Sequence, residues 1–305
     1  MGHSLKPYYT NQGIDIYHGN CLQVLKEFPT ESVHCVVTSP PYWGLRDYGT
    51  DGQLGLEETP EQHVAKMLEV FSEVRRVLRT DGTLWLNYGD TYAVGSANPS
   101  GKHSAPNVGV PRRVKNLKPK DLCGIPWRVA FALQADGWWL RQDIIWHKPN
   151  PMPESVTDRC TKAHEYIFLL SKNKKYYFDH KAIKEPAAKK IGGAPRVFGS
   201  KSQIGTNRTD YKNHFVDNGV RNKRSVWTVA VYPFKGAHFA TFPPKLIEPC
   251  IKAGCPEGGT VLDPFSGSGT TGEVAQKNGC KFIGIELNEE YIALSIQRFS
   301  QKAIF

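Results

Sequence analysis

Gly259-Thr260-Val261-Leu262-Asp263-Pro264-Phe265-Ser266-Gly267-Ser268-Gly269-Thr270-Thr271-Gly272 begins as a short apolar strand and ends as a glycine-rich loop. Residues 273–278 continue as a helix, and Cys280-Lys281-Phe282-Ile283-Gly284-Ile285-Glu286 forms a second apolar strand. A strand, a glycine loop, a helix and a second strand make up a βαβ unit, in which the helix joins two parallel strands. This stretch therefore predicts a parallel sheet within an α/β domain.

The same alternation of strands and helices extends through the N-terminal half of the chain. We expect strands at 13–18, 33–37 and 83–87 and helices at 21–28 and 60–79, the second opened by a capping box of Thr59 and Gln62. The fold class predicted is a Rossmann-like, doubly wound α/β fold with a mostly parallel sheet. Further elements expected are a helix at 125–136, strands at 138–146 and 164–170, a helix at 244–253 and a last helix capped by Asn288.

Two irregular, basic stretches interrupt this pattern, at about 92–120 and 181–225. With a formal net charge of +10 for 305 residues, they suggest a polyanionic partner, because Lys and Arg displace counterions from phosphates. A solvated surface loop is the alternative for each stretch. We predict that 181–225 is an inserted module that meets nucleic acid, between the two halves of one domain at 1–180 and 226–305. Candidate DNA contacts are Arg112, Arg113, Lys115, Arg196, Lys201, Arg208, Lys212, Arg221, Lys223 and Arg224.

Composition limits the classes of protein that need to be considered. No apolar run approaches the ~20 residues of a membrane span, and the N-terminus lacks the apolar core of a signal peptide. The seven cysteines are scattered and form no zinc-binding pattern, so we expect no metal site and a reducing, cytoplasmic location in a prokaryote or phage.

The stretch Thr38-Ser39-Pro40-Pro41-Tyr42-Trp43 follows the apolar strand at 33–37. Two prolines stop the strand and leave a stiff turn with carbonyl oxygens that no neighbouring N–H can occupy. In open α/β sheets, ligands bind at the carboxyl ends of the strands. Taken alone, the stretch fits either an ordinary turn or a binding site.

The glycine loop predicts a nucleotide-like cofactor. Gly267, Gly269 and Gly272 satisfy G-x-G-x-x-G, and Glu286 ends the next strand, where a carboxylate can accept hydrogen bonds from ribose hydroxyls. The pattern alone leaves a nicotinamide cofactor and S-adenosylmethionine both open. Asp263 favours S-adenosylmethionine, because a carboxylate attracts an ammonium group and repels a pyrophosphate.

Together these motifs resemble the amino-directed DNA methyltransferases that use S-adenosylmethionine. The matching pieces are Thr38 to Tyr42, Asp263 to Thr270 and the segment His238-Phe239-Ala240-Thr241-Phe242-Pro243. Their order, with the catalytic piece first, resembles the circularly permuted subgroup called β. The resemblance implies catalytic roles for Ser39, Pro40, Pro41 and Tyr42, and cofactor-binding roles for Asn20, Cys21, His238, Phe239, Thr241, Phe242, Asp263, Phe265, Gly267, Gly269, Thr270 and Glu286. Asn20 stands where many relatives have an acid.

The resemblance also implies the chemistry of the site. Ser39 and Pro40 would accept the two N–H bonds of an exocyclic amino group, Tyr42 would stack on the flipped base, and Trp43, Trp146 and Lys148 would line its pocket. A packing role is the alternative for each of these last three. Family members with Ser at the first motif position more often methylate cytosine N4, so we favour cytosine N4 over adenine N6.

Other functions remain to be weighed. The dipeptide Pro249-Cys250 is the nucleophile pattern for methylation at cytosine carbon 5, but it falls in an expected helix. An inactive DNA-binding protein and a methyltransferase acting on RNA or protein are further alternatives. Double-stranded DNA is the partner that the basic insertions favour; the resemblance also admits a homodimer and a cognate restriction endonuclease.

Overall fold

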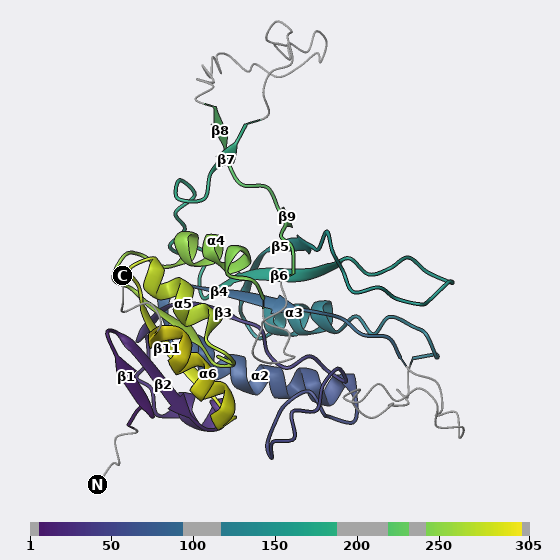
Figure 1. Ribbon diagram of the computed structural model, residues 1–305, viewed down its shortest axis with the longest axis horizontal. Coiled ribbons are helices and arrows are strands. Elements are labelled where there is room, and N and C mark those ends of the chain that lie inside the picture. The colour runs from purple at the N-terminus through teal and green to yellow at the C-terminus, as the bar shows by residue number, and fades with distance from the viewer. Residues whose placement is uncertain (1–5, 94–116, 188–218, 232–241, 301–305) are drawn as a thin grey trace, which may run out of the picture.

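The chain folds around a nine-stranded mixed sheet in the order β1-β2-β11-β10-β3-β4-β6-β5-β9 (Figure 1). The computed structural model describes residues 6–93, 117–187, 219–231 and 242–300. The strands are β1 (Tyr9–Asn11), β2 (Ile14–His18), β3 (Val33–Thr38), β4 (Leu78–Tyr88), β5 (Trp139–His147), β6 (His164–Ser171), β7 (Glu185–Pro186), β8 (Val220–Arg221), β9 (Val226–Thr228), β10 (Thr260–Asp263) and β11 (Lys281–Glu286). The helices are α1 (Cys21–Lys26), α2 (Pro60–Val77), α3 (Ile125–Ala135), α4 (Pro244–Gly254), α5 (Thr270–Lys277) and α6 (Glu289–Ser300).

The two motif-bearing strands are neighbours in the centre of the sheet. β10 is parallel to β3, with Val261 opposite Cys35, and parallel to β11, with Thr260 opposite Lys281. The carboxyl ends of β3, β10 and β11 therefore meet at one edge, although β3 lies more than 200 positions before the other two strands in sequence. This confirms the predicted α/β fold and brings the catalytic turn beside the glycine loop.

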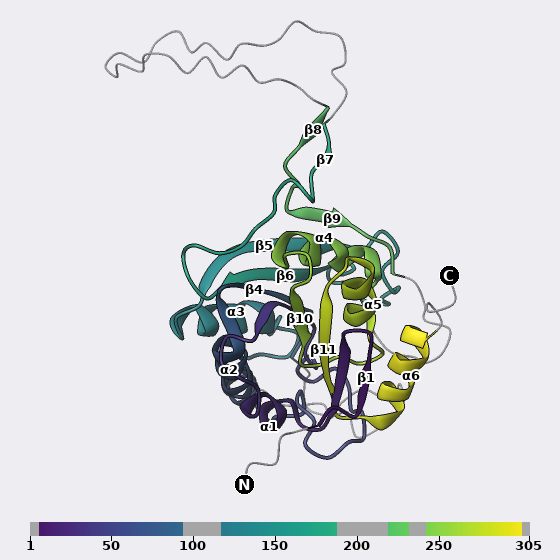
Figure 2. The same cartoon turned by 90° about the vertical axis from the view of Figure 1, so that its left-hand side faces the viewer.

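Helices cover both faces of the sheet (Figure 2). One hydrophobic core packs α1, α2 and α3 against the sheet, through buried residues such as Leu25, Phe71 and Val129. The other packs α4, α5 and α6 against the opposite face, through residues such as Ile247, Ala275 and Phe299. Apolar residues on both faces explain why the central strands β3 and β10 read as continuous apolar runs.

Three features of the sheet differ from the sequence expectations. β1 forms an additional antiparallel edge strand beside β2. β4 begins at Leu78, directly after α2, and is longer than the strand expected at 83–87. β6 runs antiparallel to both β4 and β5, so it interrupts the parallel pairing that runs from β2 to β4.

The described residues of the region expected to hold an insertion form a separate two-stranded sheet. β7 and β8 pair in a short antiparallel hairpin that projects from the body of the domain (Figures 1 and 2). β9, which follows at once, returns to the sheet and pairs in parallel with β5. Across the described ranges, no helix is both long and apolar enough to cross a membrane.

Candidate active site

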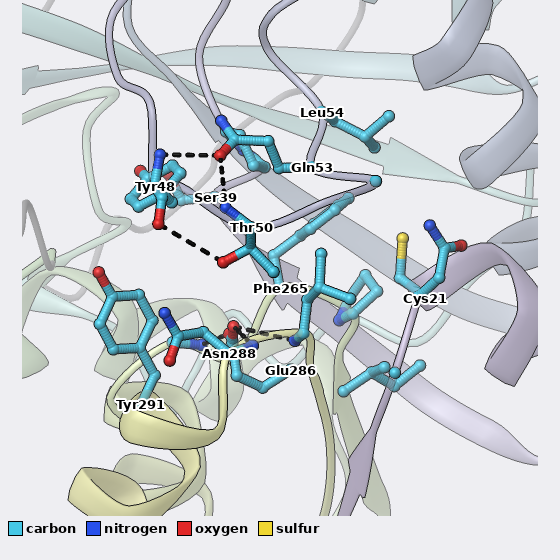
Figure 3. A pocket seen from close by; sticks show the side chains of 18 of the residues that line it. Cys21, Ser39, Tyr48, Thr50, Gln53, Leu54, Phe265, Glu286, Asn288 and Tyr291 are labelled. Carbon is cyan, nitrogen blue, oxygen red and sulfur yellow. Dashed lines mark hydrogen bonds between the residues drawn. The ribbon is translucent and has the colours of Figure 1, made fainter.

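The glycine loop and the turn after β3 line one cavity together (Figure 3). Ser39 and Pro41 come from the turn, Phe265 and Gly267 from the glycine loop, and Glu286 from the end of β11. The cavity encloses about 940 Å³ of space when its open, solvent-filled mouth is included. Of the predicted cofactor contacts, Asn20, Cys21, Phe265, Gly267 and Glu286 line this cavity.

The glycine loop needs glycine at two positions for different reasons. Gly267 and Gly269 both have a positive φ, +51° and +79°, which other residues adopt at a cost. A Cβ at Gly269 would also lie 2.7 Å from Cζ of Phe299, whereas a Cβ at Gly267 would meet no described atom within 4 Å. Gly269 therefore permits the close packing of the loop on α6, and Gly267 keeps the cavity wall open.

Glu286 ties the end of β11 to the glycine loop. Its Oε2 accepts a hydrogen bond of 2.7 Å from the Gly267 N–H, and its Oε1 accepts from the N–H groups of Leu287 and Asn288 at 2.9 and 2.8 Å. Burial raises the pKa of Glu286, although these backbone donors oppose the rise. Because a carboxylate can accept about four hydrogen bonds, capacity is left for a ligand in the cavity.

Asp263 lies beneath the cavity and not in its lining, contrary to the expectation that it faces a ligand's ammonium group. The side chain is 1% exposed and accepts hydrogen bonds of 2.6 Å from both Thr38 and Thr271 and of 3.1 Å from the Phe265 N–H. Burial is the main cause that raises its pKa to about 6. The carboxylate joins the two loops instead of contacting the ligand space directly. Gly269 and Thr270 are likewise buried outside the lining, and Thr270 accepts a hydrogen bond from Arg298.

The segment 44–58, for which the sequence predicts no element or role, forms part of the cavity lining. Tyr48, Thr50, Gln53 and Leu54 line it (Figure 3). Gln53 Oε1 accepts a hydrogen bond of 2.8 Å from the Tyr48 N–H, and the Gly44 N–H donates to the Gly55 carbonyl at 2.8 Å. Across the cavity, Tyr48 meets the ring of Tyr291 edge-on at 6.4 Å. A glycine-rich segment directly after the proline turn was the signal available in the sequence.

Tyr42 makes the densest set of polar contacts at the proline turn. Its hydroxyl accepts a hydrogen bond from Ser39 Oγ at 3.1 Å and lies 2.9 Å from Glu165 Oε2 and 3.2 Å from Asn87 Oδ1, to either of which it can donate. Its ring stacks on Tyr88 with the centroids 5.2 Å apart. Burial, with the Glu165 charge as the next cause, raises the pKa of Tyr42 well above the usual value of a phenol. Neither Asn87 nor Glu165 was among the predicted site residues.

The two tryptophans predicted for the base pocket are core residues. Trp43 is 4% exposed and donates to the Glu57 carbonyl, and Trp146 is 3% exposed and donates to the Val229 carbonyl. Trp43 packs in one hydrophobic core and Trp146 in the other. The structure therefore agrees with a packing role for both residues and not with a place in the base pocket. Lys148 lies at the site: its ammonium group forms an ion pair with Glu165 and sits 4.3 Å from the Trp146 ring centroid.

Several predicted residues fall outside the described part of the chain. These are His238, Phe239, Thr241, Arg112, Arg113, Lys115, Arg196, Lys201, Arg208 and Lys212. Phe242 is described and is buried in the core behind β10. Arg221 and Arg224 both pair with Glu185 at the base of the projecting hairpin, and the Lys223 ammonium lies 5.0 Å from the Trp227 ring centroid.

Comparison with known proteins identifies the family. Residues 33–297 match the family model of N6/N4 methyltransferases, described as DNA methylase. The chain belongs to this DNA methylase family. The type II methyltransferase M.Cfr9I of Citrobacter freundii is 48% identical over 300 residues, covering 97% of this chain and 90% of the relative. M.XycI of Xanthomonas campestris pv. cyanopsidis is 50% identical over 291 residues, covering 94% and 88%.

Solved structures agree with this DNA methylase fold. The PvuII DNA methyltransferase, titled cytosine-N4-specific, matches with a TM-score of 0.68 at 24% identity over 98% of this chain and 91% of that one. The complex of M1.HpyAVI with S-adenosylmethionine matches with a TM-score of 0.54 at 19% identity over 93% and 98%. At these identities the likeness shows the fold alone.

The residues of the cavity fit S-adenosyl-L-methionine, the cofactor that the sequence motifs predict. Phe265, Leu54 and Ile285 offer apolar surface for an adenine ring, and Glu286 stands at the end of β11. Ser268 Oγ is buried at the cavity wall and has no hydrogen-bond partner among the residues that the structure describes. An unpartnered hydroxyl in a binding loop is what a ligand's carboxylate would satisfy.

Proposed function

We propose that this DNA methylase transfers a methyl group to the N4 amino group of cytosine at a specific site in double-stranded DNA. The observation that carries the proposal is that Ser39 and Pro41 line the same cavity as Phe265, Gly267 and Glu286. A base held against Ser39 would present its amino group to the cofactor's methyl group across this cavity. The reaction is then a direct displacement, to which positioning contributes most.

The chemistry explains why the turn carries these residue types. The amino nitrogen of cytosine is a weak nucleophile, because its lone pair is delocalised into the ring. Hydrogen bonds from its two N–H groups to Ser39 Oγ and the Pro40 carbonyl would favour a localised lone pair aimed at the methyl group. S-adenosylmethionine supplies a methyl group on a positively charged sulfur.

Ser at the first motif position supports cytosine N4, as in family members with this motif. The fold-level likeness to a methyltransferase titled cytosine-N4-specific is consistent with it. The two acceptors would serve adenine N6 equally well, so the identity of the methylated base is the outcome that tests this part of the proposal.

DNA is the substrate of the family, and a base within a duplex must leave the stack to reach a site beneath a sheet edge. We propose that the region 181–225 recognises the target sequence, that 1–180 supplies the catalytic half and that 226–305 supplies the cofactor-binding half. The described members Arg221, Lys223 and Arg224 stand at the base of the hairpin of β7 and β8.

The proposal is tested by transfer of a labelled methyl group from S-adenosylmethionine to duplex DNA, with RNA and peptide as competing acceptors. We expect the label to enter DNA. We also expect it to enter a duplex that contains cytosine but no adenine. Label in RNA or peptide alone, or only in a duplex without cytosine, would contradict the proposal. The same assay with denatured DNA shows whether the enzyme needs a duplex.

A further inference from the structure

Glu165 lies at the end of a chain of hydroxyl groups that begins at the predicted methyl-acceptor site. The Ser39 hydroxyl donates to Tyr42 Oη at 3.1 Å, and the Tyr42 hydroxyl donates to Glu165 Oε2 at 2.9 Å. Both donors point in the same direction, from the cavity wall to the carboxylate. Three residues from β6 and the turn after β3 thus form one continuous hydrogen-bonded path.

Methylation of an amino group produces a proton that must leave the site. In the proposed reaction the bond from nitrogen to the methyl carbon forms while the bond from that carbon to sulfur breaks, and its electron pair stays on sulfur. The nitrogen then carries a positive charge until it loses one N–H proton. A serine hydroxyl cannot hold an extra proton, because a protonated alcohol is a very strong acid. Ser39 therefore needs a group to which the proton passes on.

We propose that Glu165 is the proton acceptor of the methyl-transfer site, reached through Ser39 and Tyr42. The amino N–H proton moves to Ser39 Oγ, the Ser39 proton moves to Tyr42 Oη, and the Tyr42 proton moves to Glu165. Each hydroxyl group receives one proton and gives up one proton, so both end unchanged. The net change is a neutral amino nitrogen and a protonated carboxyl group on Glu165. The inference rests on the proposed function and identifies a positioning residue that acts through two hydroxyl groups.

The surroundings of Glu165 suit this role. The Lys148 ammonium pairs with Oε1, so Oε2 remains for Tyr42 and for the Asn87 amide at 3.3 Å. The charged and titratable groups that face the carboxylate are Lys148 from the end of β5, Tyr42 from the proline turn, and Lys162 and His164 from the start of β6. The Glu165 side chain is 16% exposed, which gives the accepted proton a route to water.

Tyr42 is held so that it can pass a proton without moving. Its ring stacks on Tyr88, whose hydroxyl is hydrogen-bonded to the buried His63, and His63 is in turn paired with Glu57 at 2.7 Å. Asn87 Nδ2 donates to the Tyr166 carbonyl at 3.0 Å, which orients its amide with Oδ1 toward Tyr42. A phenol in this position keeps its proton at neutral pH, so it serves as a donor and an acceptor at once.

The test compares Glu165→Gln and Tyr42→Phe with the wild type in single-turnover methyl transfer. Gln keeps the size of the side chain and removes its basicity, and Phe keeps the ring and removes the hydroxyl. We expect each variant to lower the first-order rate by about a hundredfold or more, and the double variant to lose little beyond that, because both changes break one path. Glu248→Gln on α4, which removes an exposed ion pair with Lys252, is the matched control and keeps the wild-type rate.

Readouts other than the rate separate this role from a merely structural one. Binding of S-adenosylhomocysteine and of DNA is expected to equal that of the wild type in both variants. Added acetate is expected to restore part of the rate of Glu165→Ala. Isotope-edited infrared spectra of the protein alone are expected to show a carboxylate band of Glu165 that shifts in Tyr42→Phe.

The outcomes distinguish this inference from the proposed function. Wild-type protein without transfer to DNA contradicts the proposed function. Active wild type with a full rate in Glu165→Gln, or additive losses in the double variant, overturns the proton path alone. Glu165→Gln could fail to fold because Lys148 loses its partner. In that case Tyr42→Phe tests the proton path, and a full rate in Tyr42→Phe overturns it.

Discussion

Thr38 donates a 2.6 Å hydrogen bond to Asp263, although 225 positions separate the two residues in sequence. Thr38 directly precedes Ser39, and Asp263 directly precedes the glycine loop, so this bond fixes the predicted catalytic turn relative to the cofactor loop. Thr271 at the start of α5 donates to the other oxygen of the same carboxylate at 2.6 Å. The relative position of the proline turn and the glycine loop therefore depends on a buried carboxylate that does not line the cavity.

This buried carboxylate predicts a pH dependence of stability. The pKa of Asp263 is raised to about 6 in the folded protein, from an ordinary value of 3.8. A raised pKa means that the folded state holds the proton more tightly, so the contribution to stability is present below pH 4 and is lost as pH rises through 6. The loss is on the order of 3 kcal/mol. Denaturant unfolding of the wild type and Asp263→Asn between pH 4 and 7 measures it.

In Asp263→Asn this pH-dependent part is absent, since the amide does not titrate. The difference in unfolding free energy between wild type and variant is therefore expected to change across this range, in favour of the wild type at low pH. A constant difference would show that Asp263 does not change its proton occupancy on folding. The variant is also expected to transfer methyl groups more slowly, because Asn has one acceptor oxygen and so either Thr38 or Thr271 loses its hydrogen bond.

Removing the hydroxyl of Ser39 is expected to stop transfer without emptying the cofactor site. Ser39→Ala removes one of the two proposed acceptors for the amino group, and we expect the rate to fall about a hundredfold or more. The affinity for S-adenosylhomocysteine, measured by calorimetry, is expected to stay within the range of the wild type. Ser300→Ala at the end of α6, where the hydroxyl bonds only the Ile296 carbonyl, is the control. A full rate in Ser39→Ala would refute amino-group polarisation.

The two glycines of the cofactor loop are expected to respond differently to alanine. Gly267→Ala costs about 1 kcal/mol through its positive φ and adds a methyl group to the cavity wall, so cofactor affinity falls while the fold persists. Gly269→Ala adds a clash with Phe299 and Ser295 on α6 and costs about 3 kcal/mol. Thermal unfolding and calorimetric titration of both variants test this ranking, and the reverse order of stabilities would contradict it.

Cys250 is expected to be dispensable for transfer. It lies inside α4, is fully buried, and burial raises the pKa of its thiol well above the usual value, so it offers no thiolate for attack on cytosine carbon 5. Cys250→Ala is expected to retain the wild-type rate and to lose about 1 kcal/mol of stability from the small cavity. Loss of transfer in a folded Cys250→Ala protein would favour carbon methylation after all.

Local sequence patterns were sufficient to predict the elements that build the site. The proline turn after β3 and the glycine loop after β10 each combine an apolar run with residues that stop a strand, and both lie at the sheet edge where the pattern places them. Glu286 was likewise found from its place at the end of β11. Each of these signals lies within one contiguous stretch, 33–43 or 259–286, which is why a single sequence reveals them.

Contacts between distant segments could not be predicted in this way. Glu165 contacts Tyr42 because β6 pairs antiparallel with β4 in a particular register. The sequence of residues 164–171 does not indicate that register, so the contact could not be predicted. The Asp263 carboxylate is oriented by hydrogen bonds from Thr38 and Thr271, which belong to other elements. The local sequence, an acid beside a glycine loop, predicts a ligand contact instead because it does not reveal these two partners. Trp43 follows the end of β3, and Trp146 is close to the end of β5. Whether either ring faces a ligand or the core depends on packing against distant residues, and both rings pack in a hydrophobic core.

The most direct test of the account is the identity of the methylated nucleoside. DNA incubated with the enzyme and S-adenosylmethionine is digested completely, and the nucleosides are separated and weighed by mass spectrometry, with Ser39→Ala as the parallel sample. The account predicts N4-methyldeoxycytidine from the wild type and a strongly reduced yield of it from the variant. N6-methyldeoxyadenosine, 5-methyldeoxycytidine or an unmodified digest from the wild type would contradict it.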